Sequence, residues 1–183
     1  MRGRARGRER VRERIAVVHP GDGRYRKSPE GRWQSDEEAT MINVVRTMLV
    51  SRPVRDAVAY FADFAHAREW DPATVSCVRL DQGPVEPGAR WRNVSRFRGR
   101  TSEVSYRLDV LEVDRLVFTG ENGSVLITDD LRFTPVSADS TRLTYRATFG
   151  FKGVARLAAP FLRKDVNRLA DDVAAAVPRV TGL

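Results

Sequence analysis

The chain has 183 residues, 42% of them hydrophobic, and a formal net charge of +8. Half of this charge, +4, lies on residues 1–40, which have 11 basic and 7 acidic side chains. Residues 41–183 carry the other +4, with 21 basic and 17 acidic side chains. This length and composition fit one globular domain with a sizeable core. The mild charge of the longer part does not require a nucleic-acid surface, and no apolar run approaches the roughly 20 residues that span a bilayer.

Residues 1–40 are rich in arginine, glycine and acidic residues and show neither helical nor strand periodicity. Such a segment buries too little apolar area to offset the entropy of ordering, so we expect a disordered tail. Three interpretations stay open. Translation starts at Met41 and the tail is not native; the tail is merely solvated; or it is a basic arm that binds RNA, DNA or an anionic membrane. We favour them in this order and expect the folded domain over residues 41–183.

The first elements of the folded part are a strand and two short helices. Ile42–Val50 is apolar and rich in β-branched residues, which is typical of a strand. Pro53 fits the first turn of a helix, and apolar residues at i, i+3, i+4 and i+7 from Val54 give this helix one inward face. A second helical piece is expected over Phe64–Glu69, and it ends before Pro72.

Turn signals divide the middle of the chain into antiparallel strands. Asn122-Gly123 is the strongest signal, a two-residue type I′ turn, and Gly99-Arg100 and Pro135–Ser140 are expected to connect two further hairpins. Val110 and Leu116 point to the same face of the sheet only if the strands on either side are joined by a three-residue loop or contain a β-bulge. The expected pairs are Phe118 with Ile127 and Leu116 with Asp129, Phe97 with Ser102 and Ser95 with Val104, and Phe133 with Leu143 and Leu131 with Tyr145.

Because the side chains of a strand alternate between two faces, these turns together define one buried face and one solvated face. The solvated face collects arginines that interleave with acidic residues, such as Arg107 with Asp109, so we expect ion pairs there before nucleic-acid contacts. The buried face is predicted to consist of Trp91, Phe97, Val104, Tyr106, Leu108, Val110, Leu116, Phe118, Val125, Ile127, Leu131, Phe133, Leu143, Tyr145, Ala147, Phe149 and Phe151.

A long helix is expected after Gly153, over roughly residues 154–177. Pro160 is expected to kink or restart it early. An apolar stripe runs along one side, so this helix must lie on an apolar surface, and the concave face of the sheet is the surface available. The predicted stripe comprises Leu157, Phe161, Leu162, Val166, Leu169, Val173 and Val177.

The order of these elements and several short motifs resemble the START-like superfamily, also called SRPBCC, and within it the polyketide cyclase/dehydrase branch. The matching segments, all between residues 41 and 180, are Pro53, Val58–Asp63, Glu69–Pro72, Gly88–Trp91, Phe133–Pro135 and Thr141–Tyr145. The resemblance implies an α+β helix-grip fold: a seven-stranded curved antiparallel sheet around a long C-terminal helix, with two short helices after the first strand. Members of this superfamily bind lipids, sterols, polyketides, quinones or plant hormones, and some are catalysts whereas others are carriers.

The expected concave face is apolar with few polar side chains, which suits a mostly hydrophobic ligand that carries one or two oxygens. Asp129 is the candidate catalytic residue, because a carboxyl that points into an apolar pocket has a raised pKa and can transfer protons. The alternative is a one-residue bulge that turns Asp129 to water. In a cyclase, Tyr106 and Asn93 would polarise a carbonyl group. The predicted ligand-binding residues are Trp70, Trp91, Asn93, Ser95, Tyr106, Phe118, Ile127, Tyr145 and Phe149.

Other chemistries find little support in the sequence. The single cysteine, Cys77, and the two histidines, His19 and His66, do not form a zinc motif, and there is no glycine-rich phosphate loop. We therefore expect neither a metal nor a cofactor. The lone cysteine and the lack of an apolar leader are typical of a cytoplasmic protein. The sequence leaves the oligomeric state open.

Two functions are compatible with these features. The first is binding of an apolar, oxygenated small molecule such as a polyketide or lipid, with or without cyclase or dehydratase activity. The alternative is a non-catalytic interaction module that pairs with a quinone-utilising complex, or with the ribosome or RNA, through the basic arm. The sequence does not separate an enzyme from a carrier.

Overall fold

The computed structural model describes residues 25–27, 33–35 and 41–182, and the chain divides into two units, residues 1–39 and 40–183. In the first unit, strands β1 (Tyr25–Lys27) and β2 (Trp33–Ser35) pair antiparallel. The disorder expected for the rest of residues 1–40 lies outside the described residues. All the other helices and strands belong to the second unit.

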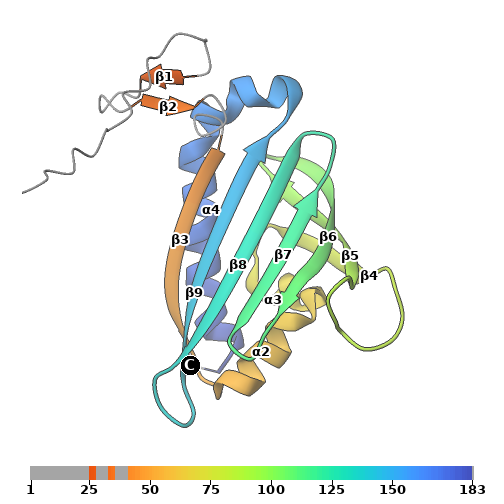
Figure 1. The fold of residues 1–183 in the computed structure, drawn as a ribbon, viewed down its shortest axis with the longest axis vertical. Helices are drawn as coiled ribbons and strands as arrows, with labels where there is room; N and C mark the ends of the chain where they lie inside the picture. Colours follow the sequence, from red (N-terminus) through yellow and green to blue (C-terminus); the bar gives the residue numbers. More distant parts are fainter. Residues whose placement is uncertain (1–24, 28–32, 36–40, 183) are drawn as a thin grey trace, which may run out of the picture. The chain divides into compact units, whose positions relative to one another are not determined.

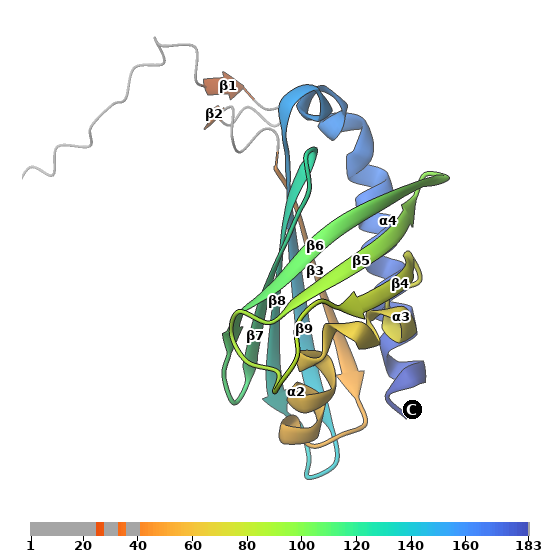
Figure 2. The same ribbon diagram turned by 90° about the vertical axis from the view of Figure 1, so that its right-hand side faces the viewer.

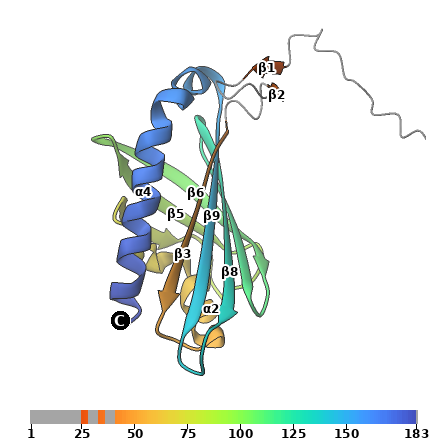
Figure 3. The same cartoon turned by 90° about the vertical axis from the view of Figure 1, so that its left-hand side faces the viewer.

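The second unit is built on one antiparallel sheet of seven strands in the order β3-β9-β8-β7-β6-β5-β4. The sheet curves, and helix α4 (Ala159–Val180) runs lengthwise along its concave side (Figure 1 and Figure 3). The predicted helix-grip fold is confirmed. The strands are β3 (Met41–Val50), β4 (Thr74–Arg79), β5 (Arg90–Phe97), β6 (Arg100–Leu111), β7 (Arg115–Glu121), β8 (Val125–Pro135) and β9 (Thr141–Phe151).

Short helical segments follow β3 and lie at the end of the sheet where α4 also ends (Figure 2). Pro53 directly precedes the first of them, where a residue without an N–H removes no helical hydrogen bond. Ala57 and Phe61 of this helix are buried, as the apolar spacing predicts. The segments are α2 (Val54–Ala62), η1 (Phe64–His66) and α3 (Ala67–Trp70).

The last helical region starts as a 3₁₀ helix, η2 (Gly153–Ala158), and continues as α4 with Pro160 in its first turn, which confirms the predicted restart. Leu157 and Phe161 do not join the buried stripe, because their side chains are 79% and 77% exposed. Phe161 is five residues before the buried Val166, roughly 140° around the helix. Leu157 lies in the 3₁₀ helix, whose tighter turn of about three residues shifts the phase of the stripe.

The β5–β6 hairpin is shifted by two residues from the predicted register. Phe97 lies opposite Arg100, not opposite Ser102. The turn consists of Arg98 and Gly99, whose φ angles of 52° and 75° both lie in the left-handed region. This is the backbone of a type I′ turn, centred one residue earlier than predicted. The glycine takes the second central position, and Arg98 is the residue that adopts the less favourable conformation.

The β7–β8 hairpin is also shifted by two residues, so that Phe118 lies opposite Asp129 and not opposite Ile127. Asn122 does not form a central position of this turn. Its N–H donates to the carbonyl of Val125 (3.0 Å), and its side-chain Oδ1 accepts from the N–H of Val125 (3.1 Å). In both shifted hairpins, an even displacement leaves the same side chains on the concave face.

The remaining strand predictions are confirmed. Phe133 lies opposite Leu143 in the β8–β9 hairpin. The register between β6 and β7 shifts between Leu108 and Val110, so the predicted bulge is present. Its extra residue is Asp109, which accepts hydrogen bonds from the side chains of Arg107 and Thr119.

Two hydrophobic clusters occupy the concave side of the sheet. The larger one joins α2, η1 and α3 to the strands. Phe64 of η1 lies within it, with ring centroids 4.3 Å from Tyr106 and 4.8 Å from Phe118. The smaller cluster joins α4 to β3 and β9 through residues such as Val44 and Val166. Side chains of the short helices therefore fill one end of the concave face.

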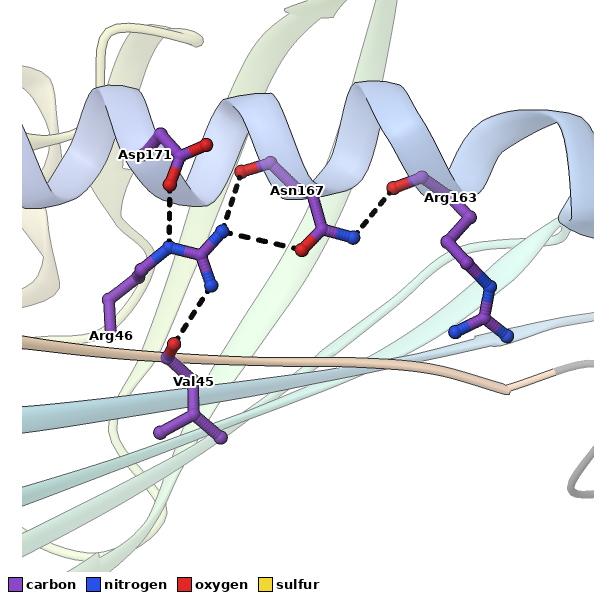
Figure 4. Close-up of polar contacts among 5 residues, drawn as sticks. All are labelled: Val45, Arg46, Arg163, Asn167 and Asp171. Atoms are coloured by element: carbon purple, nitrogen blue, oxygen red, sulfur yellow. Dashed lines mark hydrogen bonds and ion pairs between the residues drawn. The ribbon is translucent and has the colours of Figure 1, made fainter. Parts of the chain in front are cut away.

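Arg46 of β3 links the edge of the sheet to α4 (Figure 4). Its Nε donates to Asp171 Oδ1 (2.7 Å), and its second terminal nitrogen donates to the carbonyl (3.2 Å) and to the side-chain oxygen (3.3 Å) of Asn167. Asn167 in turn donates to the carbonyl of Arg163 (2.9 Å). One arginine therefore binds α4 to the outer strand at two points about one helical turn apart.

We expect Arg46→Met to loosen α4 without unfolding the domain. Asp171 is largely exposed, so the free energy of unfolding should fall by about 1 kcal/mol or less. Hydrogen exchange of the backbone amides in α4 should become faster, while exchange in β7 and β8 should not change. Arg92→Met, at an exposed position of β5, is the matched control. Equal exchange rates in both variants would show that the link does not hold the helix.

Candidate functional site

A cavity of about 170 Å³ lies between the concave face of the sheet and α4. Most of its wall is apolar, formed by Val44, Phe97, Val104, Val125, Ile127, Ala147, Phe149, Phe151, Val166, Leu169, Ala170 and Val173. Six of the predicted site residues line it: Ser95, Tyr106, Ile127, Asp129, Tyr145 and Phe149.

Asp129 points into this cavity from β8 and is only 2% exposed. The ladders on both sides of it are regular, with Asp129 opposite Phe118 of β7 and opposite Ala147 of β9. The alternative with a bulge, which would turn the carboxyl to water, is therefore excluded. The next residue, Asp130, faces the other side of the sheet and forms an ion pair with Arg115 (3.0 Å).

The carboxyl of Asp129 is paired with a phenol. The hydroxyl of Tyr145, on the neighbouring strand β9, donates a hydrogen bond of 2.7 Å to Asp129 Oδ1. A charge in an apolar surrounding is costly unless hydrogen bonds compensate it, and one hydroxyl compensates only in part. This imbalance sets the protonation of the site.

The pKa of Asp129 is raised from 3.8 to about 7. Burial is the largest cause; the hydrogen bond from Tyr145 lowers the pKa, the charge of Asp71 raises it, and the hydroxyl of Tyr106 lowers it. The pKa of both tyrosines is raised well above the usual value of 10. Burial is the main cause, and the charge of Asp129 is the second. At neutral pH, the site thus holds two phenol donors and one carboxyl that exchanges its proton easily.

Tyr106 reaches its place because its cross-strand partner is a glycine. Tyr106 of β6 lies opposite Gly120 of β7. A Cβ atom at position 120 would lie 2.6 Å from Cε1 and Cζ of the tyrosine ring, closer than real Cβ atoms approach other atoms. The ring therefore packs directly over the backbone of β7.

Asp71, which is not among the predicted site residues, also lines the cavity. Its carboxyl accepts hydrogen bonds from the hydroxyl of Thr74 (2.7 Å) and from the N–H of Ala73 (3.0 Å). Burial raises its pKa. The only signal in the sequence was an aspartate before Pro72, which is typical of a helix end and says nothing about a cavity.

Four predicted ligand-binding residues are not among those that line the cavity. Trp91 and Phe118 pack against Phe64, which occupies their end of the concave face. Trp70 is buried in the same cluster. The amide nitrogen of Asn93 donates to the hydroxyl of Thr74, and its oxygen accepts from the hydroxyl of Ser95. The four residues are Trp70, Trp91, Asn93 and Phe118.

The described residues offer few groups for other chemistry. No three His, Cys, Asp or Glu side chains among them lie close enough together to hold a metal ion. Burial raises the pKa of the Cys77 thiol to about 11, so it stays protonated. His66 stacks on Tyr60, 4.5 Å between ring centroids, away from the cavity. No helix in the described part of the chain is both long and apolar enough to span a membrane.

A second, more polar hollow adjoins the cavity. It shares Ala73, Phe97 and Leu169 with the cavity wall. Its other residues are mostly charged: Arg96, Arg98, Asp165, Arg168 and Asp172, together with Pro72. This second hollow is therefore a polar surface pocket between the end of β5 and the middle of α4, next to the apolar cavity.

Known structures with the same fold superpose on this chain. The Zhui aromatase/cyclase from Streptomyces sp. R1128 superposes with a TM-score of 0.65 at 18% identity, over 77% of this chain and 93% of that one. A START superfamily protein from Mycobacterium smegmatis gives 0.64 at 15% identity, over 76% and 96%. The di-domain ARO/CYC StfQ from the steffimycin biosynthetic pathway gives 0.59 at 16% identity, over 81% and 55%. At these identities, the likeness shows the fold alone.

No protein of curated function matches the sequence. The model of one family, described as polyketide cyclase/dehydrase and lipid transport, matches residues 41–180. This segment contains every strand of the sheet, the short helices and α4, and it agrees with the extent of the resemblance in the sequence. The chain belongs to the polyketide cyclase/dehydrase and lipid transport family.

Proposed function

We propose that the protein binds an apolar, oxygenated small molecule in the cavity and that Asp129 transfers protons to and from it. The observation that carries the proposal is the buried Asp129–Tyr145 pair in a mostly apolar chamber, with the pKa of Asp129 near 7. Apolar walls supply affinity, and a few polar groups orient the ligand.

A chain that carries several ketones, such as a polyketide, is the substrate class that suits this site. The Asp129 carboxylate takes a proton from a carbon next to a carbonyl group, and Tyr106 donates a hydrogen bond to the oxygen on which charge develops. The resulting carbanion forms a carbon–carbon bond to a second carbonyl, whose oxygen takes up the proton. This step regenerates the Asp129 carboxylate. For a dehydration, the carboxylate takes a second proton from the same carbon and gives it to the departing hydroxyl, so that water leaves as the carbon–carbon double bond forms.

Three facts support a cyclase or dehydratase over simple storage. The family includes cyclases by its description, and a similar structure is an aromatase/cyclase by its title. The pKa of Asp129 is placed where proton transfer in both directions is efficient. A chamber between the sheet and α4 would also hold a flexible chain in a folded conformer, which lowers the entropic barrier to ring closure. A carrier would use the same walls without turnover.

The test uses 2-tetralone, a bicyclic apolar ketone, as the probe. Exchange of its α-hydrogens for deuterium in D₂O, followed by NMR, should be accelerated by the full-length protein. Asp129→Asn should retain binding and lose the acceleration, by about 10²-fold or more. Asp130→Asn is the matched control, because this neighbouring carboxylate lies on the other face of the sheet.

A variant with a filled cavity completes the test. Ala170→Phe places a ring in the chamber from α4 and should abolish binding of 2-tetralone, whereas Ala175→Phe, at an exposed position of the same helix, should not. Binding without accelerated exchange in the wild-type protein would assign the carrier role. Absence of binding, or equal binding in both variants, would contradict the proposed site.

A further inference from the structure

The segment that joins β9 to α4 combines two properties. Residues 152–164 contain four basic residues, Lys152, Arg156, Arg163 and Lys164, and no acidic one. Three apolar side chains of the same segment project into solvent: Val154 is 87% exposed, Leu157 79% and Phe161 77%. We refer to residues 152–164 as the basic apolar segment.

The three apolar side chains are three and four residues apart, so they follow one another along one side of the helical turn. Single exposed apolar residues are common on proteins, and Val113 in the turn between β6 and β7 is an example. A group of three, rimmed by charges of one sign, is a mark of an interaction surface.

Three of the four positive charges of the segment are available to a partner. Among the described residues, only Lys152 of these four has an ion pair, with Glu121. The nearest acidic residue that follows in the chain, Asp165, is paired with Arg98 (3.4 Å). The surface thus offers a net positive charge together with projecting apolar groups.

We propose that the basic apolar segment docks on an anionic lipid bilayer, with Val154, Leu157 and Phe161 inserted at the level of the head groups. Such a combination of basic and apolar side chains is what binds a helix in the plane of an anionic membrane surface. The apolar side chains project outward, and neither hollow described above includes them. A fluid bilayer accommodates projecting side chains, whereas a protein partner needs a matching hollow.

The segment also borders the cavity. Phe151, which directly precedes it, and Val166, which closely follows it, both line the chamber. Docking through this segment would hold that end of the chamber next to the bilayer. An apolar ligand would then pass between membrane and cavity with little exposure to water, which extends the proposed function without depending on proton transfer.

The first experiment places a reporter on the segment of the full-length protein. Leu157→Cys is labelled with an NBD fluorophore, and the native Cys77 is spared because it is buried. Emission should brighten and shift to the blue with vesicles of phosphatidylcholine and phosphatidylglycerol, and much less with phosphatidylcholine alone. Val113→Cys, labelled in the same way, should not respond. A response to poly-glutamate equal to that with vesicles would overturn the bilayer proposal.

The second experiment measures vesicle binding of unlabelled variants by sedimentation. Leu157→Ser with Phe161→Ser should weaken binding on the order of 100-fold, because two apolar groups leave the membrane. Arg156→Gln with Arg163→Gln should weaken it roughly 25-fold, since each charge near an anionic surface contributes about fivefold. Val113→Ser is the control, expected to be unchanged. Binding that persists in the Leu157→Ser/Phe161→Ser variant would place the contact elsewhere in the chain, including residues 1–40, and would overturn the proposal.

Discussion

Replacing Asp129 by asparagine is expected to stabilise the protein at pH 8 relative to the wild type, and to do so much less at pH 5. The pKa of Asp129 is about 7 in the folded protein, whereas an aspartate in an unfolded chain titrates near 3.8. Between these values, the folded state binds more protons than the unfolded state. The free energy of unfolding of the wild type therefore falls as the pH rises from about 4 to about 7.

The asparagine keeps an oxygen that accepts from Tyr145 but does not titrate. We expect the difference in unfolding free energy between Asp129→Asn and the wild type to grow by about 2–4 kcal/mol from pH 5 to pH 8. Urea unfolding of both proteins at several pH values measures this. Asp71, whose pKa is also raised, is present in both proteins, so of its contribution only the coupling to Asp129 differs between them. Asp130→Asn should show no such trend, and parallel curves for Asp129→Asn would contradict the raised pKa.

Gly120→Ala is expected to damage both stability and ligand binding. The added Cβ would lie 2.6 Å from two carbons of the Tyr106 ring, so the ring has to move toward the chamber. Overpacking of this kind costs about 1–3 kcal/mol of unfolding free energy. The affinity for 2-tetralone should fall as well, because the displaced phenol occupies part of the space that the ligand needs.

Gly123→Ala in the adjacent turn is a suitable control, since nothing lies within 4 Å of the added atom. Tyr106→Leu in the Gly120→Ala protein removes the ring and should restore part of the stability. This coupling separates steric conflict from a loss of strand propensity or flexibility. If Gly120→Ala were as harmless as Gly123→Ala, the close approach of ring and backbone would not hold in solution.

The sequence was a sufficient guide to which faces of the strands are buried, because period-two alternation is a property of the whole sheet. It was a weaker guide to register. The type I′ turn at Arg98-Gly99 needs an arginine in the left-handed region, and no local preference favours that. Likewise, the side chain of Asn122 closes its turn from a flanking position, which a two-residue turn signal does not reveal.

The candidate site could be predicted only in part, because a cavity depends on what the helices leave empty. Asp129 and Tyr145 were identified from their shared face. Trp91 and Phe118 were placed on the correct face as well, but Phe64 covers their end of it, and no strand pattern shows where a short helix packs. Asp71 was missed because it lies in a loop, where neither alternation nor helical spacing applies.

The regular ladder around Asp129 has a consequence for how this sheet can change during evolution. Loops between its strands can gain or lose two residues, and the carboxyl still points inward; a change of one residue would exchange the chamber wall with the solvent side. Homologous chains should therefore differ in the length of these hairpins by an even number of residues more often than by an odd number. An even change of length leaves Asp129 facing the chamber. An odd change turns it to solvent unless a bulge, like that at Asp109, takes up the extra residue.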